Sequence, residues 1–308
     1  MNGPRFTVII ATYNREDLLP RAISSVLGQT FKDFELLVID NGSTDGTRAA
    51  VEAIKDPRLK YILNPQPTAS CDAPRNLGIK LAKGSLIAFL DDDDIWYPQR
   101  LEKVNKAFEE NPDVAAVCHN EFRNISGRRS ELLVYGPWGQ DMHERLLYDK
   151  NCLSSCATTI KTGLLNELGG FDLRKEFGAA ADYDFWLRMT AKGAKTHFIE
   201  EPLGEFNFTG KNWSVADTAF QSRVAFLIKT HILNYEKRPL LLISTKGMRR
   251  LFKLYFIAGR FFLRARKYKD ALKCFSQAAL FIIMRPILLG RLFSEARGNI
   301  DSMQVKFF

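Results

Sequence analysis

The sequence predicts an α/β protein with a doubly wound, mostly parallel sheet, followed by a basic helical C-terminal region. Short apolar runs alternate with amphipathic helical patterns over about the first 115 residues, as expected for parallel strands joined by helices. Polar residues, several of them acidic, follow these runs where each predicted strand ends. Beyond Ala216 only helical patterns remain. We therefore expect one domain at residues 1–215 and a helical region at residues 216–308.

The first elements follow from two simple patterns. The apolar run at residues 6–11 predicts a buried strand, because parallel strands are covered on both faces. The apolar positions between residues 16 and 29 keep helical spacing, which predicts an amphipathic helix. The same criteria predict strands at residues 34–39, 59–63 and 86–90, and helices at residues 47–55, 74–83 and 98–110.

The pattern is mixed between residues 114 and 213. We expect short helices near Met142 and Lys161 and a longer helix at residues 182–192. Strands are predicted at residues 114–118 and 196–199.

Composition limits the class of protein. The chain has 308 residues, of which 46% are hydrophobic, as in a globular protein. No stretch approaches the ~18 apolar residues that span a bilayer, and the first residues do not resemble a signal peptide. The five cysteines form no CxxC pair, so we interpret them as reduced thiols. These features predict a cytoplasmic protein.

Four consecutive aspartates, Asp91, Asp92, Asp93 and Asp94, follow one of the predicted strands. Ligands of open α/β sheets bind at the carboxyl ends of the strands. Adjacent carboxylates repel one another, and a hard divalent cation removes the repulsion. A cation at this place can hold a diphosphate, so the segment indicates an enzyme that binds a nucleotide diphosphate.

Other polar residues are predicted at the same edge of the sheet. Thr12 and Tyr13 follow the first strand, Asp40 follows the second, and Arg75 lies near the start of a helix, where it can reach a phosphate. Each alone has a simpler explanation, since an aspartate after a strand is often a helix cap. A dinucleotide-binding dehydrogenase is disfavoured, because residues 11–16 contain no glycine fingerprint.

Six segments in order give the chain a close resemblance to a known family. They are VIIATYNR at 8–15, LVIDNGSTDGT at 37–47, RNLG at 75–78, FLDDDDIW at 89–96, GGFD at 169–172 and DYDFWLR at 182–188. Together they resemble the family-2 inverting glycosyltransferases, which have the GT-A nucleotide-sugar transferase fold. The resemblance covers residues 5–215.

The resemblance implies a role for each matching residue. It implies that the nucleoside lies against Thr12, Tyr13 and Asp40, with Asp40 facing the base, and that Arg75 lies near the diphosphate. The DxD motif falls on Asp91 and Asp93. Asp93 is the implied ligand of Mn²⁺ or Mg²⁺, with Asp91 or Asp92 near the ribose or the metal, although the register could shift by one in a run of four. The catalytic base matches Asp182.

These roles imply a metal-dependent inverting transferase that uses a nucleotide-diphospho-sugar, most simply a UDP-sugar. The acceptor would be a hydroxyl of a surface polysaccharide, a lipid-linked oligosaccharide or a similar glycan. One departure matters: Ala181 precedes Asp182 where the family has an acidic residue. This leaves open a catalytically silent nucleotide-sugar-binding or scaffold protein. Trp138 and Trp213 are candidates for the acceptor site, whereas Trp96 and Trp186 are expected in the core.

Charge is distributed unevenly along the chain. Residues 1–220 carry 26 Lys+Arg and 31 Asp+Glu, a net charge of −5, whereas residues 221–308 carry 18 and 4, a net charge of +14. A helical projection brings six basic residues within about 60° of one another. This basic stripe consists of Lys246, Arg249, Lys253, Arg260, Arg264 and Lys267.

The basic stripe has two interpretations. A second amphipathic segment at residues 271–282 would allow a helical hairpin that packs on the catalytic domain and leaves the stripe in solvent. Alternatively, the stripe binds the anionic surface of the cytoplasmic membrane and makes the enzyme a peripheral membrane protein. We favour the second interpretation, and we expect no nucleic-acid partner.

Overall fold

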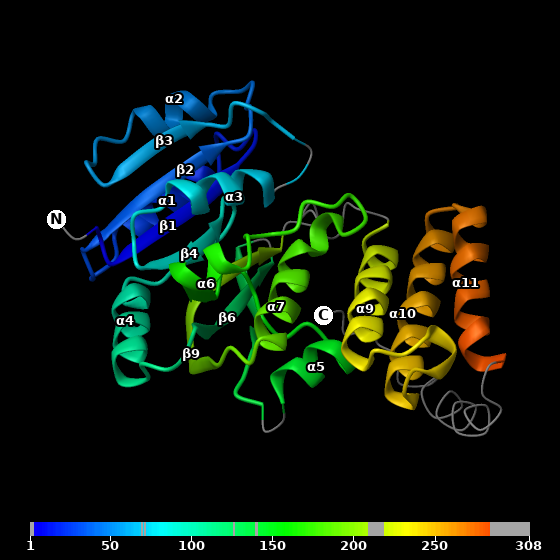
Figure 1. Cartoon of the computed structure of the whole chain (residues 1–308). Coiled ribbons are helices and arrows are strands. Elements are labelled where there is room, and N and C mark those ends of the chain that lie inside the picture. The colour runs from blue at the N-terminus through cyan, green and yellow to red at the C-terminus, as the bar shows by residue number, and fades with distance from the viewer. Residues whose placement is uncertain are drawn as a thin grey trace. The chain divides into compact units, whose positions relative to one another are not determined.

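The computed structural model describes residues 3–68, 70, 72–125, 127–138, 141–208 and 219–283 (Figure 1). The chain divides into two compact units. The first comprises Met1–Gln140, Cys152–Leu173 and Ala181–Asn212, and the second comprises Asp141–Asn151, Arg174–Ala180 and Trp213–Phe308. The second unit therefore combines the C-terminal region with two short segments from earlier in the chain. The assignment of residues 1–215 as the catalytic domain stays a prediction.

A mixed sheet forms the centre of the first unit. Its strands are β1 (Phe6–Thr12), β2 (Phe34–Asp40), β3 (Leu59–Leu63), β4 (Leu86–Asp91), β5 (Ile95–Trp96), β6 (Ala116–Ile125), β7 (Arg128–Leu133), β8 (Thr158–Lys161) and β9 (Thr196–Phe208). Their order is β3-β2-β1-β4-β8-β6-β9-β5, and β7 pairs with β6. The first four strands pair in parallel, and Figure 1 shows them side by side in blue and cyan. The predicted α/β class with a largely parallel sheet is confirmed.

Strand β8 separates the sheet into two regions. It pairs antiparallel with both β4 and β6, whereas β6 pairs in parallel with β9. The sequence predicted only a short helix near Lys161, and the structure has both elements, with β8 ending at Lys161 and α6 (Thr162–Glu167) following. Strands β5 and β7 were also missed.

Helices cover the sheet in the expected alternation. The first unit contains α1 (Leu19–Leu27), α2 (Thr47–Glu52), α3 (Asp72–Leu81), α4 (Arg100–Glu110), α6 and α7 (Ala181–Ala191). Helix α3 packs closely on β1 at Gly78. A Cβ atom at this position would lie only 2.7 Å from Cγ2 of Ile9. Trp96 and Trp186 are buried, as predicted.

The register of the strands brings three predicted site residues together. Thr12 lies opposite Asp40 in the β1–β2 ladder, and Ala11 lies opposite Asp91 in the β1–β4 ladder. The carboxyl ends of β1, β2 and β4 therefore end level with one another at one edge of the sheet.

Among its described residues, the second unit contains helices and 3-10 turns but no strand. It contains α5 (Met142–Tyr148), a 3-10 turn at Gly178–Ala180, α9 (Phe220–Glu236), a 3-10 turn at Leu240–Leu242, α10 (Thr245–Arg264) and α11 (Tyr268–Ile283). Helices α10 and α11 form a hairpin around Ala258, Phe262, Ala271 and Cys274. The described helices confirm the predicted helical C-terminal region. Helix α10 ends at Arg264, so Lys267, the last residue of the basic stripe, lies in the turn before α11 and not on the predicted helix. No described helix is both long enough and apolar enough to cross a membrane.

Candidate active site

Two loops join at the carboxyl ends of β1 and β2. Asn14 adopts a left-handed backbone with φ of 52°, and its amide group bonds to the turn after β2. The Asn14 N–H donates to Ser43 Oγ at 2.8 Å, and the Thr44 N–H donates to Asn14 Oδ1 at 2.8 Å. These bonds fix the two loops against each other at the edge where Thr12 is buried and Tyr13 is exposed.

Asp40 is buried at the end of β2 and shapes the turn that follows. One of its carboxylate oxygens accepts hydrogen bonds from the N–H groups of Gly42, at 3.0 Å, and Ser43, at 2.8 Å. The other accepts a hydrogen bond from the hydroxyl of Tyr61 at 2.7 Å. Asp40 thus stabilises the turn after β2. Its contact with a nucleoside base stays a prediction.

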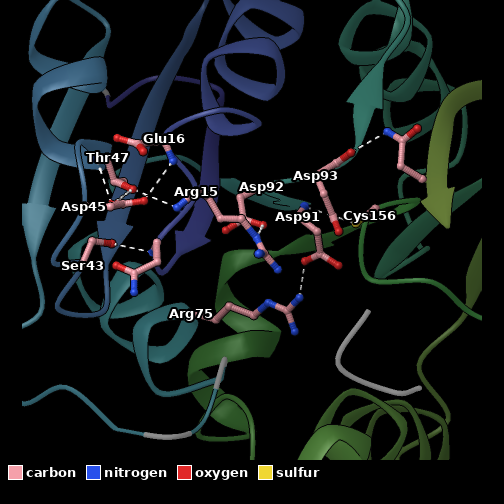
Figure 2. A network of polar contacts seen from close by, with 12 residues as sticks. Arg15, Glu16, Ser43, Asp45, Thr47, Arg75, Asp91, Asp92, Asp93 and Cys156 are labelled. Atoms are coloured by element: carbon pink, nitrogen blue, oxygen red, sulfur yellow. Dashed lines mark hydrogen bonds and ion pairs between the residues drawn. The ribbon is translucent and has the colours of Figure 1, made fainter. Parts of the chain in front are cut away.

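The four aspartates after β4 have different surroundings. Asp91 forms an ion pair with Arg75, and Asp92 forms one with Arg15 at 3.3 Å (Figure 2). Asp94 is buried and accepts a hydrogen bond from the backbone N–H of Asn207 at 2.7 Å. The aspartate run is therefore fixed to the first loop, to α3 and to β9 at once.

Burial and mutual repulsion disfavour ionisation of these carboxyl groups. Burial, together with the negative charges of Asp91 and Asp92, raises the pKa of Asp93 to about 7. Burial also raises the pKa of Asp92, against the opposing effects of the Thr12 hydroxyl and Arg15. Burial raises the pKa of Asp94 well above its usual range. A cation at this turn would relieve the repulsion, so the site fits the metal that the sequence predicted.

A cysteine that the sequence analysis did not predict lies beside the aspartate turn. Asp91, Asp94 and Cys156 each place one potential ligand atom within 4.8 Å of the others. The Asp91 N–H also points to Cys156 Sγ at 3.3 Å. Cys156 precedes β8, and only the pairing of β8 with β4 brings it to the site.

Arg75 is buried between two carboxylates. It donates to Asp72 at 3.0 Å and also bonds to Asp91. Its guanidinium carbon lies 5.9 Å from the centre of the Phe171 ring. The sequence analysis missed Asp72, although its position three residues before Arg75 on a helix was a usable sign, because such pairs face each other.

Asp182, the predicted base, lies at the start of α7. The backbone N–H of Tyr183 donates to its carboxylate at 2.6 Å. Burial and the nearby charge of Asp72 raise the pKa of Asp182 to about 7, while Arg75 opposes the rise. Ala181, which replaces the expected acidic residue, is buried. Asp182 therefore has a pKa suited to proton transfer near neutral pH.

Of the two candidate acceptor-site tryptophans, the structure describes one. Trp138 is half-buried, and its indole N–H donates to the carbonyl of Tyr135. Its contact with an acceptor stays a prediction. Trp213 lies outside the described residues.

Comparison with known proteins identifies the family. Residues 7–169, more than half of the chain, match the family model described as Glycosyl transferase family 2. The chain belongs to glycosyl transferase family 2. The family and the relatives described below are glycosyltransferases, and the chain is accordingly a glycosyltransferase.

Two named bacterial proteins are related in sequence to this family-2 transferase. One, from Escherichia coli (strain K12), is provisionally named colanic acid biosynthesis glycosyl transferase WcaA. It is 34% identical over 212 residues, which cover 65% of this chain and 71% of the relative. The other is the Escherichia coli UDP-Glc:alpha-D-GlcNAc-diphosphoundecaprenol beta-1,3-glucosyltransferase WfgD. It is 32% identical over 188 residues, which cover 59% of this chain and 68% of the relative.

Two solved structures share the fold of the family-2 transferase. S. aureus TarS 1-349 in complex with UDP-GlcNAc has a TM-score of 0.63 at 18% identity, over 90% of this chain and 92% of that one. The mannosyltransferase PcManGT from Pyrobaculum calidifontis, in complex with GDP-Man and Mn²⁺, has a TM-score of 0.57 at 19% identity, over 90% and 76% of the two chains. Both confirm the GT-A-type fold.

Proposed function

We propose that this family-2 transferase is an inverting, metal-dependent enzyme. It moves a sugar from a nucleotide-diphospho-sugar, a UDP-sugar, to a hydroxyl of a glycan or lipid-linked acceptor in surface polysaccharide synthesis. The observation that carries the proposal is the meeting of the ends of β1, β2 and β4 beside Arg75, in the unit that also holds Asp182. The UDP-GlcNAc bound to TarS and the UDP-Glc in the name of WfgD support a UDP-sugar donor.

Asp93 and Asp91 are the residues that would hold Mn²⁺ or Mg²⁺. Carboxylate oxygens are hard ligands and suit both ions. Bound there, the ion would supply Lewis-acid stabilisation of the negative charge that develops on the leaving diphosphate. The Mn²⁺ in PcManGT supports this cofactor.

Asp94 and Cys156 are weaker candidates for metal ligands. Asp94 is buried, and its carboxylate already accepts the backbone N–H of Asn207 in β9. Burial raises the pKa of the Cys156 thiol, and sulfur is a soft ligand that suits neither Mg²⁺ nor Mn²⁺ well. We therefore retain Asp93 and Asp91.

The remaining residues bind the donor and move one proton. Thr12, Tyr13 and Asp40 would contact the nucleoside, with Asp92 near the ribose, and Arg75 would donate to the diphosphate. Asp182 takes the proton of the acceptor hydroxyl as the new bond to C1 forms and the bond between C1 and the diphosphate oxygen breaks. A single displacement of this kind inverts C1 and needs no covalent nucleophile on the protein.

The names of two relatives support the class of acceptor, and the charge of residues 221–308 supports the location of the enzyme. The diphosphoundecaprenol in the name of WfgD and the colanic acid in the name of WcaA support a lipid-linked or polysaccharide acceptor. A net charge of +14 in residues 221–308 favours binding to the anionic cytoplasmic face of the membrane, which would bring the enzyme to a lipid-linked acceptor.

A panel of sugar nucleotides tests the proposal. Purified protein with Mn²⁺ should hydrolyse or transfer from UDP-sugars, and a chelator should abolish this turnover. The alternative function, a silent nucleotide-sugar-binding or scaffold protein, rests on Ala181 and predicts donor binding without turnover for every member of the panel. Turnover that survives the chelator would contradict the metal dependence alone.

A further inference from the structure

A basic cavity lies in the second unit at the start of α10. Its volume is about 390 Å³. Tyr148 and Asp149 from the end of α5 line one side, and α10 contributes Thr245, Lys246, Arg249, Arg250 and Lys253. Four cations and one carboxylate therefore face a space large enough for a phosphate or diphosphate group.

The carboxylates near the cavity leave it positively charged. Asp149 pairs with Arg145 at 3.4 Å, and Glu144 pairs with Lys246 at 3.0 Å. Within the part of the chain that the structure describes, Arg249 and Lys253 form no ion pair, and both are exposed. The charge of these two side chains is therefore available to an anion.

The start of α10 already holds a negative charge. Ser244 caps α10, since its hydroxyl accepts the N–H of Gly247 at 3.1 Å, and the carboxylate of Glu236 accepts hydrogen bonds from Ser244 and from the hydroxyl of Tyr148, so the positive charge of the cavity comes from its side chains. Arg250 is buried in the wall of the cavity. Tyr148 gives a flat aromatic face, with the ammonium of Lys246 at 5.9 Å from its centre.

The cavity divides the basic stripe into two halves. Lys246, Arg249 and Lys253 line the cavity, whereas Arg260, Arg264 and Lys267 do not. Diffuse attraction to an anionic surface would use both halves, because both contribute three positive charges. A specific binding site in the cavity would involve only Lys246, Arg249 and Lys253.

We infer that this cavity is a binding site for a phosphate- or diphosphate-bearing group. Arginine and lysine side chains converge on it and can donate charge-assisted hydrogen bonds to phosphate oxygens. A lipid headgroup and a soluble phosphate compound share this chemistry. The inference goes beyond the proposed function and holds whichever sugar the enzyme transfers.

Two triple variants of the full chain test the site at equal charge. The cavity variant is Lys246→Ala with Arg249→Ala and Lys253→Ala, and the matched control is Arg260→Ala with Arg264→Ala and Lys267→Ala. Calorimetric titration with inorganic pyrophosphate should show binding that the cavity variant loses by about 100-fold and the control by less than about threefold. Arg249→Gln, a single change at an exposed position, should weaken binding by about fivefold if the triple variant folds poorly.

Vesicles distinguish the two sources of the phosphate. The same proteins are sedimented with phosphatidylcholine vesicles that contain phosphatidic acid, a monoester, or phosphatidylserine, a diester. A selective loss of phosphatidic acid binding by the cavity variant assigns the site to a lipid headgroup, and a loss confined to pyrophosphate assigns it to a soluble compound. Equal losses in the two triple variants, or no saturable binding of either probe by the wild type, would overturn the inference.

Discussion

Asp182 can accept a proton only when it is ionised. Its pKa is raised above the ordinary value to about 7, so the ionised fraction grows as pH rises through 7. We expect kcat/KM for the donor, which reports the pKa of the free enzyme, to rise about tenfold per pH unit below the pKa and to level off above it. Asp72→Asn removes a charge that raises this pKa and should move the profile to lower pH. A flat profile between about pH 5 and about pH 8 would contradict the assignment.

Replacing the base itself separates chemistry from donor binding. Asp182→Asn should lower kcat by roughly 10²-fold or more and leave UDP affinity close to that of the wild type. Steady-state kinetics and UDP titration measure the two quantities. Weaker UDP binding with an unchanged kcat would place Asp182 in the donor site instead.

The metal site makes a different prediction at Asp93. Asp93→Asn should abolish transfer and weaken UDP binding in the presence of Mn²⁺, because the neutral amide is a poorer ligand for a hard cation. In the absence of metal, UDP affinity should hardly change, which makes the metal-free protein the matched control. A variant with near wild-type turnover would show that Asp93 is not a ligand.

At the scale of elements, the contact of α3 with β1 constrains Gly78. An alanine Cβ would lie 2.7 Å from the fully buried Ile9, whose branched side chain has little freedom to move. We expect Gly78→Ala to lower the free energy of unfolding by about 1–3 kcal/mol, despite the better helix propensity of alanine. Urea denaturation measures this change. Gly163→Ala, where a Cβ would contact nothing within 4 Å, should be close to neutral.

The elements that the sequence predicted best are the ones with a long, single pattern. The buried runs of β1, β2 and β4 and the amphipathic α1 and α4 repeat one period over several residues, and β3 was predicted at its observed bounds. Strand β5 has two residues, too few to show a period. Strand β7 is mostly exposed and charged, so it lacks an apolar face to detect.

The same reasoning explains which site residues could be predicted. Thr12, Asp40 and Asp91 follow apolar runs, and parallel strands must end at a common edge, so their proximity follows from local patterns. Cys156 reaches the site through the antiparallel pairing of β8, which depends on contacts between distant residues. No local pattern encodes such a pairing.

At the scale of the whole molecule, the uneven charge predicts how the protein partitions. Vesicles with anionic lipid should sediment the full-length protein, and high salt should release it, because screening weakens attraction between exposed charges. Replacing all six residues of the basic stripe with glutamine lowers the net charge of residues 221–308 from +14 to +8 and should strongly reduce sedimentation. Equal binding to neutral vesicles, or no loss in the six-residue variant, would show that the stripe is only solvated.

Arg75 connects events that occur at different ends of the site. It contacts Asp72, whose charge raises the pKa of Asp182, and Asp91, which also raises it. A cation bound at Asp91 should therefore lower the pKa of Asp182. By reciprocity, a proton on Asp182 should weaken the binding of the cation by the same factor. At neutral pH the enzyme without the cation would then keep much of Asp182 protonated, and binding of the cation would favour the ionised base before the acceptor arrives.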